Sequence, residues 1–123
     1  MKKILITIAF ILVAIITQGE TLKELQSRLP NGELITEEGM YLYIVEGDVE
    51  DEVLRIYVYE ETQTIIQRTI SLFPISSFIS FRRELQDNPS FIRLDRNTFY
   101  DKENDVILTL DLGDDYLYLI VNF

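Results

Sequence analysis

The chain contains 123 residues, of which 21 are acidic and 11 are basic, and it has no His, Cys or Trp. This length suits one domain. The missing Cys and His exclude disulfides, thiolate nucleophiles, thiolate-bound metals and the most common general base. The formal net charge of −10 argues against nucleic-acid binding, because that affinity depends on cationic side chains that neutralise phosphates.

The N-terminus has the layout of a secretory signal. Lys2 and Lys3 are followed by fourteen uncharged residues, 4–17, and the chain then returns to polar composition. A helix of fourteen residues extends about 21 Å, which is shorter than the roughly 30 Å hydrocarbon core of a membrane. The pattern therefore favours a cleaved signal, with an uncleaved membrane anchor as the alternative.

We expect cleavage after Gly19, because Thr17 and Gly19 then occupy the two small-residue positions before the cut. Residues 1–19 are accordingly interpreted as the signal peptide and residues 20–123 as one globular domain. The mature protein is expected in the periplasm or outside the cell, with no stable membrane span after cleavage.

The mature domain is predicted to begin with a short helix. Thr21 and Glu24 form a capping box, leucines follow at helical spacing, and Pro30 stops the helix. A second helix is expected over residues 75–86, from its apolar residues at spacings of three and four. Runs rich in β-branched and aromatic residues predict strands at 39–46, 53–59, 64–73, 91–94, 98–100, 106–112 and 116–123.

These elements predict an α+β fold. Short polar linkers between the strands favour a meander, so we expect a mostly antiparallel sheet or curled half-barrel of five to seven strands. The helix over 75–86 is expected to pack on one face of this sheet, with the short N-terminal helix as a further element.

Six of the seven tyrosines occur in Tyr-x-Tyr pairs, which place both rings of a pair on one face of a strand. The aliphatic residues between them look like the core-facing set, so we expect the tyrosines to lie together on the opposite face. A face of phenol rings suits recognition of a peptide, protein or glycan. The alternative is structural: tyrosine favours strands, and the helices could cover this face. The predicted ligand-binding residues are Tyr41, Tyr43, Tyr57, Tyr59, Tyr116, Tyr118, Arg55 and Arg68.

The leading functional hypothesis is an exported, acidic, non-catalytic domain that binds a protein, peptide or glycan partner in the cell envelope. Arg55 and Arg68 are expected to anchor an acidic group of that partner. No cofactor is expected, and no catalytic or metal-binding residues are singled out, because the carboxylates lie mostly in turns without a recognised spacing.

Two alternatives remain open. A secreted hydrolase could act through an Asp/Glu pair, which needs neither His nor Cys and requires two convergent carboxylates in a cleft. A structural subunit of an envelope assembly could instead associate through an exposed strand edge.

Overall fold

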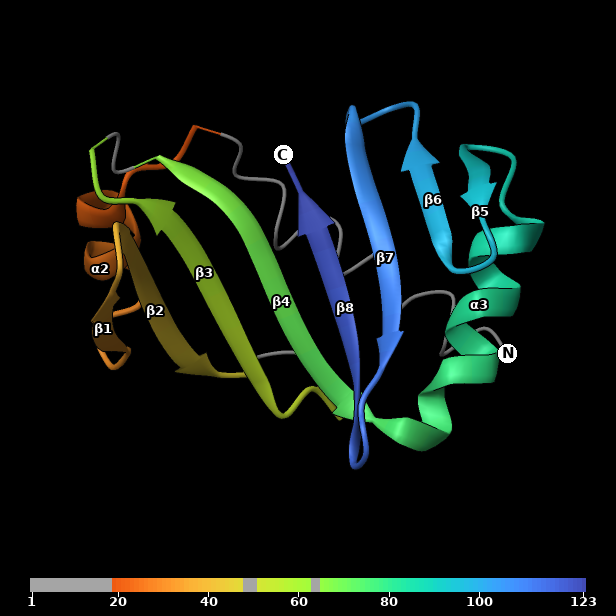
Figure 1. Cartoon of the computed structure of the whole chain (residues 1–123), viewed down its shortest axis with the longest axis horizontal. Helices are drawn as coiled ribbons and strands as arrows, with labels where there is room; N and C mark the ends of the chain where they lie inside the picture. The colour runs from red at the N-terminus through yellow and green to blue at the C-terminus, as the bar shows by residue number, and fades with distance from the viewer. Residues whose placement is uncertain (1–18, 48–50, 63–64) are drawn as a thin grey trace.

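The computed structural model describes residues 19–47, 51–62 and 65–123. These residues form an eight-stranded antiparallel sheet with two α-helices (Figure 1). The elements in chain order are α2 (Leu22–Arg28), β1 (Glu33–Glu37), β2 (Met40–Glu46), β3 (Leu54–Glu60), β4 (Ile66–Pro74), a 3-10 turn η1 (Ile75–Ser77), α3 (Phe78–Asp87), β5 (Phe91–Asp95), β6 (Thr98–Asp101), β7 (Val106–Leu112) and β8 (Tyr116–Asn122).

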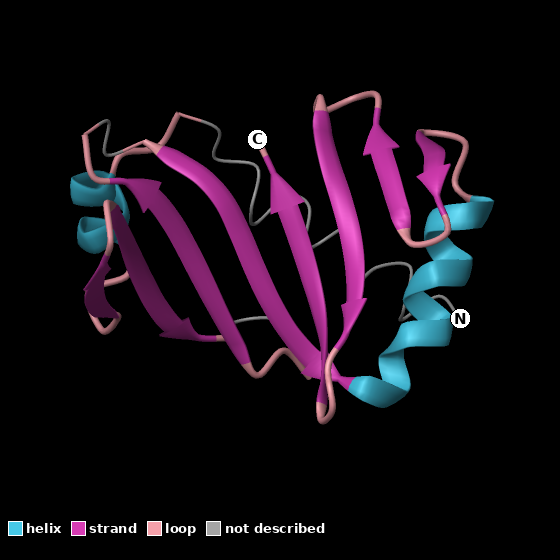
Figure 2. Ribbon diagram, viewed as in Figure 1, coloured by secondary structure: helices cyan, strands magenta, loops and turns pink. Residues whose placement is uncertain are grey.

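The sheet consists of two meanders joined at their last strands. Its order is β1-β2-β3-β4-β8-β7-β6-β5, so β4 pairs with β8, and η1 and α3 carry the chain from the first meander to the second (Figures 1 and 2). The sheet does not close, and β1 and β5 are its edges. The predicted α+β fold with an antiparallel sheet is confirmed, whereas the expected count of five to seven strands is wrong.

The additional strand is β1, for which no strand was predicted from the sequence. It forms a hairpin with β2 through the two-residue turn Glu38-Gly39, where Gly39 has a φ of 75° that favours glycine. Four of the five residues of β1 are exposed, so no alternation between buried and exposed residues marks it. A short, exposed edge strand has too weak a hydrophobic pattern to be recognised from sequence.

Both predicted helices are present. The first begins as predicted, and the second does not. The Thr21 hydroxyl accepts a hydrogen bond from the Glu24 amide at 3.2 Å and caps α2, as the capping box predicts. The second helix begins instead with the 3-10 turn η1 after Pro74, and the Ser77 side chain makes no capping hydrogen bond. The sequence therefore predicts where this helical segment lies, but not that its first turn is a 3-10 turn.

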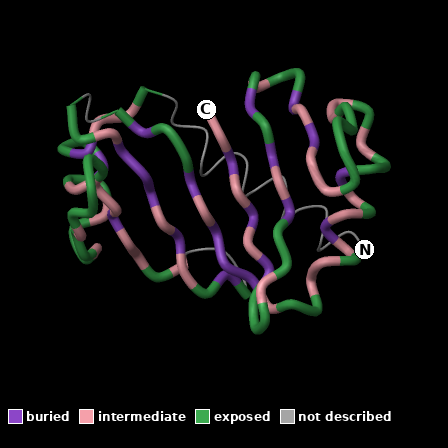
Figure 3. The backbone as a smooth tube through the Cα atoms, viewed as in Figure 1, coloured by how far each residue is buried: buried purple, intermediate pink, exposed green. Residues whose placement is uncertain are grey.

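Both helices pack on the same face of the sheet, near its opposite ends (Figures 1 and 2). Leu25 of α2 joins a core cluster with residues of β2 and β3, and Phe81 and Leu85 of α3 join a second cluster with β6, β7 and β8. Figure 3 shows the buried residues concentrated along the central strands. We call this side of the sheet the covered face and the other side the open face.

The predicted signal segment lies outside the described residues except for Gly19. Within the described ranges, no helix combines the length and the apolar character that crossing a membrane requires.

Candidate functional site

The strand registers assign the predicted tyrosines to two different faces. Tyr57 pairs with Thr69, and Thr69 pairs with Val121, which belongs to the core cluster under α3. Residues paired directly across an antiparallel sheet share a face, so Tyr57 lies on the covered face. The covered face carries Tyr41, Tyr43, Tyr57, Tyr59 and Arg55; the open face carries Tyr116, Tyr118 and Arg68.

The prediction of one shared tyrosine face is therefore wrong. Leu22 and Leu25 of α2 pack on the tyrosines of β2 and β3, and the exposed fraction of Tyr43 and Tyr57 falls to 2% and 0%. The aliphatic residues of β2 and β3, which were expected to face the core, lie on the open face instead. In β8 the expectation is correct, because Leu117, Leu119 and Val121 are buried opposite the tyrosines.

Tyr43 has a structural role that its hydrogen bonds define. Its hydroxyl donates to the Leu29 carbonyl and accepts from the Gly32 amide at 3.1 Å. These bonds fix the chain between α2 and β1 to the sheet. A side chain at position 32 would collide with the Tyr43 ring, so glycine is required for this close approach.

Tyr59 is fully buried and its hydroxyl has no hydrogen-bond partner among the described residues. Burial raises the pKa of the Tyr59 phenol above its usual range, and the nearby Glu20 carboxylate raises this pKa further. Tyr59 therefore remains neutral at physiological pH and contributes apolar surface to the core.

Arg55 is buried with its own counter-ion. Its guanidinium donates from Nε and Nη2 to the Glu52 carboxylate at distances of 2.9 to 3.0 Å, and the exposed fraction of the Arg55 residue is 1%. This pair lies in the interior, so the structure does not bring Arg55 together with the exposed Arg68. Arg68 lies on the open face, where its Nε donates to Asn122 Oδ1 at 2.9 Å.

The buried carboxylates make structural contacts. In the part of the chain that the structure describes, the buried carboxylates are those of Glu52 and Asp101. Asp101 accepts hydrogen bonds from the amides of Glu103 and Asn104 and from the Asn104 side chain, the last at 2.6 Å. These bonds hold the β6–β7 turn. Among the described residues, no group of three or more acidic side chains is arranged to hold a metal ion.

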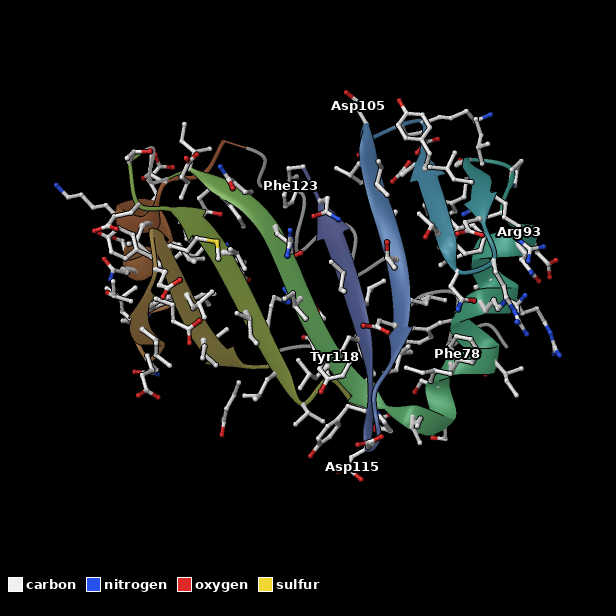
Figure 4. The ribbon with its side chains drawn as sticks, viewed as in Figure 1. Phe78, Arg93, Asp105, Asp115, Tyr118 and Phe123 are labelled. Atoms are coloured by element: carbon white, nitrogen blue, oxygen red, sulfur yellow. The ribbon has the colours of Figure 1, made fainter. Side chains whose placement is uncertain are left out.

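The open face has an apolar centre that no described helix covers. Four isoleucines, each half-buried, lie side by side on β2, β3, β4 and β8, and we call them the isoleucine row: Ile44, Ile56, Ile70 and Ile120. Leu42 and Leu54 border the row, and Tyr118 continues this face on β8, where its ring lies on the near side of the ribbon in Figure 4.

Exposed carboxylates surround this centre, and we call them the acidic rim: Glu33, Glu37, Glu46 and Asp111. The registers place Glu33 beside Ile44, and Asp111 beside Tyr118. Arg68 is the single cation among the described open-face residues of these strands. The open face is thus apolar in the middle and negative around it.

Comparison with known proteins found no matching family model, no matching curated protein and no matching solved structure.

The isoleucine row was absent from the predicted site. Ile44 and Ile56 were expected to face the core, and Ile70 and Ile120 were not singled out as binding residues. Both faces of β2 and β3 are apolar in sequence, so alternation alone could not decide which face the helices cover. The number of large apolar residues could have indicated an uncovered apolar face, because two short helices cannot cover both faces of a broad sheet.

Proposed function

We propose that this protein is an exported, non-catalytic binding domain that holds a basic protein surface on its open face. The observation that carries the proposal is the isoleucine row, an apolar area across four strands that neither described helix covers. Apolar patches of this kind, bordered by charged residues, are typical of protein interaction sites.

The charge on this face selects the kind of partner. The acidic rim opposes acidic proteins by like-charge repulsion and attracts Lys and Arg residues that surround an apolar contact. This selection differs from the original hypothesis, in which Arg55 and Arg68 anchor an acidic group. Arg55 is buried and paired, and Arg68 stands alone among the carboxylates of the open face.

The direct test is calorimetric titration of the purified protein with a synthetic amphipathic peptide of leucine and lysine. We expect binding that weakens in 0.5 M salt, roughly three times the physiological ionic strength, because the rim charges are exposed to solvent. The corresponding peptide of leucine and glutamate should not bind. Equal binding of both peptides would contradict a charge-selective site.

Variants locate the binding surface. Ile56→Lys places a cation in the isoleucine row and is expected to weaken binding of the lysine peptide by about tenfold or more. Leu34→Lys is the control, because Leu34 is likewise an apolar residue of a strand but lies exposed on the same face as Tyr43. The proposal fails if Leu34→Lys reduces binding as much as Ile56→Lys does.

A further inference from the structure

A second surface of this chain has the chemistry that the open face accepts. Four arginines lie on α3, on β5 and in the turn after β5. The helix α3 and the strand β5 contact each other. In Figure 4, Arg93 lies next to α3. We call this surface the arginine end; its cations are Arg82, Arg83, Arg93 and Arg96, four of the nine basic residues that follow residue 19.

The arginines of the arginine end form no ion pair within the described chain, although Glu84, Asp87 and Asp95 also lie on α3 and β5. Arg93 instead donates to the backbone carbonyls of Asp95 and Arg96 at 3.3 and 3.4 Å, and these bonds leave its positive charge in place. The guanidinium groups of these arginines are therefore available to carboxylates from outside.

Exposed apolar side chains lie among these arginines. The exposed fractions of Ile79 and Leu94 are 68% and 55%, the largest among the large hydrophobic residues of the described chain. On α3, a shallow depression of about 240 Å³ is lined by Phe78, Ile79, Arg82, Arg83 and Gln86. An exposed helix stripe that combines isoleucine with arginine is suited to a protein contact, where arginine is enriched.

We propose that the partner held by the open face is the arginine end of a second copy of this chain. This inference rests on the proposed function and names its partner. Ile79 of one copy would contact the isoleucine row of the next, while Arg82 and Arg83 pair with the acidic rim. Helices commonly cover sheet faces in this way, and the charges of the two surfaces are complementary.

The fold requires that this contact be made between copies. The helix α3 packs on the covered face, so a chain cannot place its own α3 stripe on its own open face. Contact between two open faces would bring two acidic rims together and is disfavoured by like charge. The remaining arrangement is head-to-tail, in which each copy uses two different surfaces and the assembly grows as a ring or filament.

Sedimentation velocity of the purified protein over a range of concentrations tests the proposal. We expect association in low salt and monomers in high salt. The variant Arg82→Glu with Arg83→Glu should raise the dissociation constant by about tenfold or more. Its control, Lys23→Glu with Lys102→Glu, changes the net charge equally at two exposed sites outside α3 and β5 and should still associate, more weakly by the general charge effect alone.

A charge exchange identifies the two surfaces as partners. The variant Glu46→Lys with Asp111→Lys should also associate more weakly than wild type by about tenfold or more, because cations then stand on both of its surfaces. Mixing it with the Arg82→Glu and Arg83→Glu variant restores opposite charges at every contact, so we expect the mixture to associate. A monomeric wild-type protein at all concentrations, or a mixture that stays monomeric, would overturn the proposal.

The same proteins separate this inference from the proposed function. Binding of the leucine and lysine peptide to a wild-type protein that stays monomeric would leave the proposed function intact and reject the second copy as partner. Failure of the peptide to bind a monomeric wild-type protein would reject both.

Discussion

At the scale of single residues, the tyrosines of β2 and β3 act through their positions in the interior. Tyr43 uses its hydroxyl to connect the chain after α2 to the sheet, whereas Tyr59 contributes a buried ring without a hydrogen bond to a described residue. The same residue type therefore provides a polar connection at one position and apolar packing at another.

The variant Tyr43→Phe tests the first of these roles. It removes the hydroxyl that bonds to Leu29 and Gly32 and leaves their backbone groups without this partner, so the free energy of unfolding should fall by about 1–3 kcal/mol. Urea denaturation measures this change. Tyr116→Phe, at an exposed position on the open face, should change it by less than about 0.5 kcal/mol. Equal effects of the two variants would contradict the structural role of Tyr43.

The raised pKa of Tyr59 predicts how stability depends on pH. The folded state favours the protonated phenol, so this stabilisation is complete below the unfolded pKa of about 10 and is lost as the pH rises through the higher folded pKa. Tyr100, whose pKa is raised by its hydrogen bond to Asp105, contributes with the same sign. Unfolding curves above about pH 10 should show a smaller decline for Tyr59→Phe than for wild type. An identical decline would mean that Tyr59 is not buried.

Glu52 and Arg55 form a buried ion pair, in which each charge stabilises the other. Glu52→Gln removes the charge of the carboxylate that accepts hydrogen bonds from the buried Arg55 guanidinium, so the free energy of unfolding is expected to fall by about 3–5 kcal/mol. Glu46→Gln is the matched control at an exposed site and should have a small effect in the same urea experiment. A small effect of Glu52→Gln would show that this pair is accessible to water.

At the scale of secondary structure, α2 determines which tyrosines are buried. Leu25 is its one fully buried side chain and packs with the tyrosines of β2 and β3. Leu25→Ala should lower the free energy of unfolding by about 2–5 kcal/mol. In the same urea experiment Leu34→Ala, at an exposed position in β1, should cost much less. A similar loss for both variants would mean that α2 does not hold the covered face.

The sequence predicts the positions of the helices and strands along the chain better than it predicts which face of the sheet each helix covers. Seven of the eight strands and both helices lie close to their predicted ranges, because β-branched runs and turn residues act locally. The face that α2 covers depends on contacts distant in sequence, and both faces of β2 and β3 are apolar. The strand β1 and the isoleucine row were not predicted, because neither is marked by a clear alternation of apolar and polar residues along one strand.

At the scale of the whole molecule, the proposed export makes a prediction about the N-terminus. We expect protein purified from the cells that produce it to begin at Glu20, which intact mass spectrometry measures directly. A mass that matches all 123 residues, 14.4 kDa, would contradict signal cleavage.

The different surfaces of the molecule lie on different sides of the sheet, which determines where the proposed partner binds. Both helices occupy one face, the acidic rim surrounds the apolar centre of the other, and the arginine end lies beside β5 at one edge of the sheet. A molecule with these different surfaces can hold a partner on the open face without rearranging its core.

Binding on the open face requires that the isoleucine row be accessible to solvent in the free protein. A soluble paramagnetic agent relaxes methyl signals according to their exposure, so it compares the methyls of Ile44, Ile56, Ile70 and Ile120 with those of buried Leu110 and Leu117 in one spectrum. The open face predicts strong relaxation of the isoleucine methyls in dilute protein and protection once the leucine and lysine peptide is added. Isoleucine methyls as protected as the two leucines in the dilute protein would show that the face is covered and would contradict the proposed binding site.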